Sequence, residues 1–188
     1  MKDDIIIVSG LPRSGTSMMM KMLEAGGLEV LVDHIRKPDE DNPKGYYELE
    51  KAKKIKQDAS WLPEAQGKVF KMVSMLLRDL PLGRRYKIIF MKRNMEEILA
   101  SQKKMLTRLG QDSGTPDEEM GRLFGKHLKD IENWLEGQPH MDVVYISYND
   151  ILENPQENLH TLNQFLENRL DVQKMVAVVD RALYRQRK

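Results

Sequence analysis

Residues 10–17, with the sequence G-L-P-R-S-G-T-S, have the composition of a phosphate-binding loop. Gly10 and Gly15 have the separation of the two glycines in the nucleotide-binding pattern G-x-x-x-x-G-K-[ST], where glycine lets backbone N–H groups approach a phosphate. The apolar run at 5–8 predicts a buried strand before this segment, and helical spacing of apolar residues predicts a helix over 16–25 after it. The positive end of that helix dipole favours a bound anion. We call residues 10–17 the glycine loop.

The glycine loop differs from the nucleotide-binding pattern at its lysine. Thr16 occupies that position, and Arg13 supplies a positive charge instead. In P-loop kinases and ATPases the lysine reaches the β- and γ-phosphates of the nucleotide. Its absence argues against ATP hydrolysis, although a phosphotransferase or ATPase remains an alternative function, as does a non-catalytic nucleotide-binding protein.

Residues 11–17 resemble the 5′-phosphosulfate loop of the sulfotransferases, whose usual form is P-[KR]-S-G-T-[TS]. The resemblance implies an α/β fold of the P-loop type, with a central, mostly parallel sheet flanked by helices. It also implies 3′-phosphoadenosine 5′-phosphosulfate as co-substrate, in-line transfer of its sulfuryl group to a hydroxyl or amine, and no metal. The implied donor-binding residues of the loop are Leu11, Pro12, Arg13, Ser14, Gly15, Thr16 and Ser17.

A second motif is similar to the 3′-phosphate site of the same family, which has an arginine at a strand end and a serine eight residues later. Arg93 follows a strand predicted over 86–91, and Ser101 lies eight residues on. Asn94 is predicted to cap the next helix, with Glu97 completing a capping box. Ser101 then lies about two turns into the helix, on the side of the cap. Tyr148 belongs to a segment, 144–152, that resembles the family's last core strand, and is a further donor-binding candidate.

Sulfuryl transfer requires an in-line acceptor, removal of its proton and stabilisation of charge on the bridging oxygen. Lys71 ends a strand predicted over 68–72, where the family often places a lysine, and is the candidate for charge stabilisation. The family's general base is a histidine or a glutamate. His34, Glu48 and Asp33 are the candidates here; of these, His34 titrates nearest to neutrality. The sequence leaves the choice among the three open.

Length and composition limit the possible partners. The chain of 188 residues is predicted to form one domain, 1–188, and its net charge of +1 gives no reason to expect nucleic acid as a partner. The absence of cysteine excludes disulfides and thiolate metal sites. The first apolar run is too short for a signal peptide or a membrane span, so we expect a cytoplasmic protein. A small molecule or a peptide is the expected acceptor, and the oligomeric state stays open.

Periodicity predicts further elements between these motifs. We expect a short strand over 30–32, a loop over 33–47, a helix over 48–59, a helix beginning at 115–118, a strand over 143–146, and helices from 154 and 171. The family's adenosine-covering R-K-G loop has no counterpart here, and the basic segment 180–188 is its candidate replacement.

Overall fold

Four parallel strands form the centre of the protein in the computed structural model, which describes residues 4–33, 35, 39, 45–111 and 114–179. The strands are β1 (Ile5–Gly10), β2 (Val69–Lys71), β3 (Tyr86–Lys92) and β4 (Met141–Ser147), in the spatial order β2-β1-β3-β4. Every residue of β1 is buried, as expected for an inner strand of a parallel sheet covered on both faces. The predicted fold class, a parallel sheet flanked by helices, is confirmed.

The strand register brings the predicted motifs to one edge of the sheet. Gly10 of β1 is paired with Met91 of β3, and Lys92 of β3 is paired with Ser147 of β4. Arg93 and Tyr148 therefore leave their strands beside the start of the glycine loop. Lys71 is paired with Val8 at the end of β2, on the other side of β1. Ligand sites of open α/β sheets lie at this carboxyl edge.

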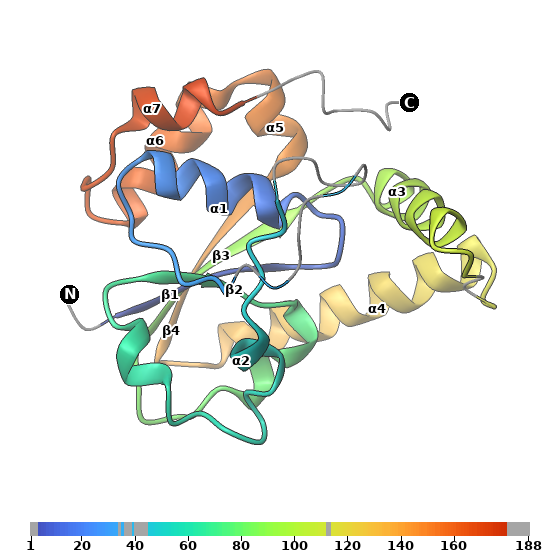
Figure 1. Ribbon diagram of the computed structural model, residues 1–188, viewed down its shortest axis with the longest axis horizontal. Coiled ribbons are helices and arrows are strands. Elements are labelled where there is room, and N and C mark those ends of the chain that lie inside the picture. The colour runs from blue at the N-terminus through green and yellow to red at the C-terminus, as the bar shows by residue number, and fades with distance from the viewer. Residues whose placement is uncertain (1–3, 34, 36–38, 40–44, 112–113, 180–188) are drawn as a thin grey trace.

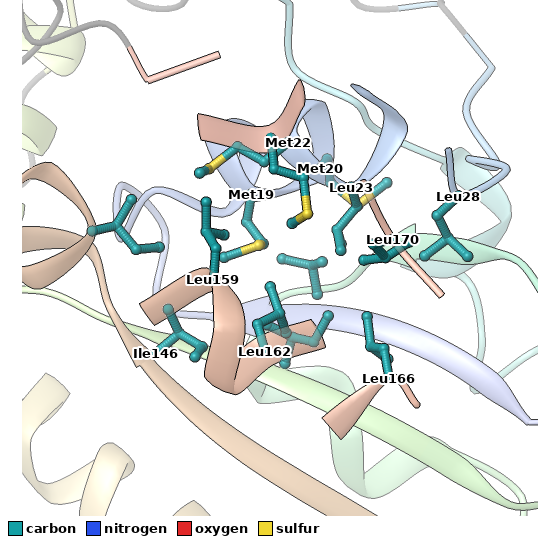
Figure 2. Close-up of a cluster of buried hydrophobic side chains, with 14 of the residues drawn as sticks. Met19, Met20, Met22, Leu23, Leu28, Ile146, Leu159, Leu162, Leu166 and Leu170 are labelled. Atoms are coloured by element: carbon teal, nitrogen blue, oxygen red, sulfur yellow. The ribbon is translucent and has the colours of Figure 1, made fainter. Parts of the chain in front are cut away.

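One face of the sheet is covered by α1 (Thr16–Ala25), α5 (Tyr148–Glu153), α6 (Pro155–Phe165) and α7 (Val172–Ala177). Figure 2 shows Met19 and Met20 of α1 in one cluster with Leu159 and Leu162 of α6, and all four are fully buried. This core holds α1, and therefore the end of the glycine loop, against the sheet.

The opposite face is covered by α2 (Glu50–Lys53), α4 (Asp117–Glu136) and two short 3₁₀ helices, η1 (Leu62–Ala65) and η2 (Ser74–Asp79) (Figure 1). Its core includes an edge-to-face pair between Trp61 and Phe70, with ring centroids 5.0 Å apart. The remaining helix, α3 (Met95–Arg108), packs beside α4. A small cluster of Leu11, Ile98 and Phe124 joins the glycine loop to α3 and α4.

Two predicted elements differ in the structure, and one helix was not expected. The helix expected over 48–59 is only the four-residue α2, because this charged segment has no long apolar stripe to pack on the sheet. The strand expected over 30–32 is a single bridge between Val30 and Val69, followed by one hydrogen bond from the N–H of Leu31. Helix α5 was not predicted. The segment 180–188 lies outside the described residues.

Candidate active site

The glycine loop is a tight turn whose conformation depends on both glycines. The φ angles of Gly10 and Gly15 are 146° and 93°, a region that favours glycine. A Cβ on Gly10 would lie 2.6 Å from the carbonyl oxygen of Met91, and one on Gly15 would lie 2.4 Å from the ring of Tyr148. Within the loop, the hydroxyl of Ser14 donates to the carbonyl of Leu11 at 2.7 Å. The buried Ser14 side chain therefore holds the turn, and the loop packs closely between β3 and Tyr148.

The side chain of Arg13 joins the two predicted motifs. Its Nε donates to the hydroxyl of Ser101 at 2.9 Å, across 88 positions of sequence. Arg93 in turn donates from NH1 to the carbonyl of Arg13 at 3.0 Å. This hydrogen bond supports Arg13 in its left-handed conformation, with φ of 69°. Two motifs that lie far apart in the sequence thus meet in one site.

Tyr148 completes this group. The guanidinium carbon of Arg93 lies 4.4 Å from the centroid of the Tyr148 ring, the geometry of a cation–π contact. Burial, the largest effect, raises the pKa of the Tyr148 phenol, so the ring stays neutral at physiological pH. We call Arg13, Arg93, Ser101 and Tyr148 the arginine cluster. Two guanidinium groups beside a hydroxyl suit an anion such as a phosphate.

Lys71 lies on the other side of the glycine loop, at the start of α1. Its ammonium donates to the hydroxyl of Ser17 at 3.3 Å and to the carbonyl of Tyr46. Ser17 donates to the same carbonyl at 3.0 Å. The phenol of Tyr46 is itself bonded at 2.6 Å to Asp39, which also accepts from Arg108 of α3. A cation therefore lies at the amino end of α1, where the helix dipole is positive.

Two of the three candidate bases have structural partners. Asp33 accepts the backbone N–H of Ile35 at 3.0 Å and that of Glu50, the first residue of α2. Glu48 forms an ion pair with Lys53 at 2.6 Å. The third candidate, His34, lies outside the described residues. The backbone N–H of Asp33 donates to the carbonyl of Glu48 at 3.2 Å, so the segments bearing these carboxyl groups run side by side.

Glu97 and Asn149 belong to the site, although neither was predicted from the sequence to lie there. Arg93 Nε donates to Glu97 Oε2 at 2.8 Å, and the two side chains are only 8% and 6% exposed. The amide of Asn149 donates to Glu97 Oε1 at 3.0 Å, and its oxygen accepts the N–H of Asn94 at 3.3 Å. The spacing of Arg93 and Glu97, four residues apart at a helix start, is the signal that could have pointed to this pair.

The predicted capping box is therefore wrong in one half. Asn94 does cap α3, because its side chain accepts the N–H of Glu96 at 2.9 Å. Glu97, however, does not turn back to the N–H of Asn94, which is bonded to Asn149 instead. The buried guanidinium of Arg93 is a stronger hydrogen-bond donor to the Glu97 carboxylate than a backbone N–H would be.

Neither a cluster of metal ligands nor a membrane-spanning helix is found in the part of the chain that the structure describes. Within residues 4–33, 35, 39, 45–111 and 114–179, no three or more His, Cys, Asp or Glu side chains are grouped as metal ligands. Among the helices formed by the same residues, none is long and apolar enough to cross a membrane.

Comparisons with known proteins agree with this architecture. The family model described as "Sulfotransferase domain" matches residues 2–188. Sulfotransferase 1A1 of Rattus norvegicus is 23% identical over 205 residues, which cover 98% of this chain and 67% of the rat protein. The chain belongs to the sulfotransferase family, as the sequence motifs predicted, and it is a sulfotransferase.

Two solved sulfotransferase structures are similar to this chain to different degrees. The sulfotransferase domain from the curacin biosynthetic pathway has a TM-score of 0.51 and 17% identity, covering 88% of this chain and 74% of that domain. Mouse sulfotransferase SULT7A1 complexed with PAP has a TM-score of 0.46 and 15% identity, covering 97% of this chain and 64% of the mouse chain. The first of these supports the α/β sulfotransferase fold.

Proposed function

We propose that this enzyme transfers a sulfuryl group from 3′-phosphoadenosine 5′-phosphosulfate to a hydroxyl or amine acceptor by in-line displacement. The observation that supports this donor is the contact of both Arg93 and Ser101 with Arg13 of the glycine loop. A nucleotide with phosphates on both ends of one ribose needs two neighbouring anion sites. The arginine cluster and the amino end of α1 are such a pair.

The 5′-phosphosulfate binds the glycine loop in this proposal. The backbone N–H groups of Gly15, Thr16 and Ser17 begin α1 and are directed toward its amino end, where an anion is stabilised. Leu11 and Pro12 form the entry of the loop, and buried Leu11 anchors it to Ile98 and Phe124. Thr16 supplies a hydroxyl donor at the position where ATP-binding loops have lysine.

The 3′-phosphate binds Arg93 and Ser101. Arginine suits this task because its planar fork forms paired hydrogen bonds with phosphate oxygens. Ser101 is 7% exposed and already bonded to Arg13, so its hydroxyl is fixed in position before a ligand arrives. Tyr148, beneath Arg93 and against Gly15, forms the wall between the two phosphate sites.

The reaction forms one bond and breaks one. The acceptor oxygen or nitrogen attacks the sulfur while the bond from sulfur to the bridging oxygen breaks, and adenosine 3′,5′-bisphosphate leaves with the bonding electrons. Lys71, at the end of β2, stabilises the charge that develops on the bridging oxygen, together with the N–H groups of the loop. None of these steps requires a metal.

The acceptor proton goes to His34, Glu48 or Asp33. Asp33 is the weakest of the three, because both of its carboxylate oxygens accept backbone N–H groups that shape the start of α2. The substitutions His34→Ala, Glu48→Gln and Asp33→Asn separate them. The true base is the residue whose loss abolishes transfer while binding of adenosine 3′,5′-bisphosphate is unchanged.

The acceptor is a small molecule or a peptide, and we expect the enzyme to act in the cytoplasm. Neither expectation depends on the donor site, and a screen of phenols, alcohols, amines and tyrosyl peptides with radiolabelled donor addresses the first directly.

Calorimetry with adenosine 3′,5′-bisphosphate tests the proposal. We expect saturable, magnesium-independent binding that ATP does not displace at equal concentration. Failure of the folded protein to bind millimolar bisphosphate would refute the donor assignment. Magnesium-dependent ATP binding would favour a phosphotransferase, and bisphosphate binding without transfer to any acceptor would favour a non-catalytic nucleotide-binding protein.

A further inference from the structure

Glu97 is a buried carboxylate that contacts the arginine expected to bind phosphate. It lies one helical turn after Arg93 and accepts from Arg93 Nε at 2.8 Å, while both side chains are almost fully buried. Burying a carboxylate costs free energy, and only a well-placed partner such as Arg93 offsets that cost. The pair also fixes the orientation of the Arg93 guanidinium.

The guanidinium of Arg93 is held on three sides. Glu97 accepts from Nε, the carbonyl of Arg13 accepts from NH1, and the ring of Tyr148 lies 4.4 Å from the guanidinium carbon. The two hydrogen bonds fix the rotation of the guanidinium within its own plane. The contact with the Tyr148 ring fixes the orientation of that plane. An arginine fixed in this way loses little conformational entropy when phosphate binds.

Asn149 fixes Glu97 in turn. Its amide group donates to Glu97 Oε1, and its oxygen accepts the N–H of Asn94, so the amide orientation is set by the helix start. Glu97 therefore has each carboxylate oxygen bonded to a different partner. A chain of hydrogen bonds therefore connects the start of α3 to Arg93 through Asn149 and Glu97.

We propose that Glu97, oriented by Asn149, is a positioning residue that aligns Arg93 for the 3′-phosphate and so sets the preference for a 3′-phosphorylated nucleotide. The inference rests on the proposed function, because it assigns a role to a neighbour of the proposed 3′-phosphate site. A positioning role for Glu97 predicts one result that a purely structural ion pair does not. Loss of Glu97 should weaken recognition of the 3′-phosphate specifically, and leave the 5′ end of the nucleotide unaffected.

Glu97→Gln tests alignment with a side chain of the same shape. The glutamine oxygen can accept from Arg93, but its NH₂ group then faces the NH₂ group of Asn149. A flip of Asn149 would relieve this clash only by losing the bond from Asn94. We expect the affinity for adenosine 3′,5′-bisphosphate to fall about tenfold, equal to about 1.4 kcal/mol. The affinity for adenosine 5′-monophosphate should change by less than about twofold, since Glu97 acts through Arg93, which the proposed function assigns to the 3′-phosphate.

The swapped pair Glu97→Gln with Asn149→Asp is the rescue. Its glutamine oxygen accepts from Arg93, and its glutamine NH₂ donates to the new carboxylate at position 149, whose second oxygen accepts the N–H of Asn94. Every hydrogen bond of the network is restored, with the polarity of the bond between positions 97 and 149 reversed, and the net charge equals that of the wild type. We expect the double variant to regain the bisphosphate affinity to within about threefold of wild type.

Glu96→Gln is the matched control, because Glu96 is the exposed neighbour and the substitution removes the same charge from the same turn. Asn149→Ala provides a test that changes no residue of α3 itself, with an expected loss of about threefold. An unchanged ratio of bisphosphate to monophosphate affinity in Glu97→Gln, or a double variant no better than the single one, would overturn the inference. If the wild type binds no bisphosphate, the proposed function fails instead, so the two failures are distinct.

Discussion

Gly15→Ala should both destabilise the protein and damage its nucleotide site. The new methyl group would lie 2.4 Å from the Tyr148 ring, about 1 Å inside ordinary contact. The φ angle of 93° adds a backbone penalty of about 1–2 kcal/mol for a residue with a side chain. Displacing a buried ring costs about 1–3 kcal/mol more, so we expect a total loss of about 2–5 kcal/mol in the free energy of unfolding.

Gly27→Ala is the matched control at the other end of α1. Its φ angle is 99°, nearly that of Gly15, but no atom of the residues that the structure describes lies within 4 Å of the added Cβ. It therefore reports the backbone penalty without the steric one, about 1–2 kcal/mol. The difference between the two variants measures how tightly Tyr148 packs on the loop.

Urea unfolding of both variants, followed by calorimetry with adenosine 3′,5′-bisphosphate, is the assay. We expect Gly27→Ala to bind like the wild type, whereas Gly15→Ala binds weakly even where it is folded, because the ring that contacts Arg93 has moved. Equal losses of stability in the two variants, or unimpaired binding by Gly15→Ala, would refute this account of the loop.

Two further predictions concern Lys71 and His127. Lys71→Met should lower the transfer rate about 10²–10³-fold while bisphosphate binding changes little, because one donor to the developing charge is lost. Single-turnover kinetics measures the transfer rate, and an equal loss in bisphosphate binding would contradict the role of Lys71. His127 is half-buried and bonded to Ser74 at 2.8 Å, and burial, followed by the charge of Arg78, lowers its pKa. The folded state therefore binds a proton at His127 less readily than the unfolded state does. The contribution of His127 to the free energy of unfolding is complete above the ordinary histidine pKa of about 6.5, and it falls as the pH drops below that value. Urea unfolding at pH values of about 7.5 and about 5.5, on either side of that pKa, should show a smaller pH effect in His127→Gln than in wild type, and identical effects would count against the assignment.

The sequence alone determined the elements and motifs whose signals are local. The run at 5–8, the two glycines and the helix over 16–25 identify the strand, loop and helix that the structure contains, because strand propensity, turn chemistry and helical spacing act within a few residues. The membership in the sulfotransferase family followed from the same loop together with Arg93 and Ser101. The fold class followed from the family resemblance that these motifs carry.

Tertiary structure decided how these residues meet. The bond between Arg13 and Ser101 joins positions 88 apart, and the bond from Arg93 to the Arg13 carbonyl joins positions 80 apart. Such contacts depend on strand order and register, which no short segment encodes. Glu97 shows the same limit: locally it favours a capping box, but the buried guanidinium of Arg93 and the amide of Asn149 are better partners. Local sequence specifies what each segment can form, and packing selects which of its polar groups face the site.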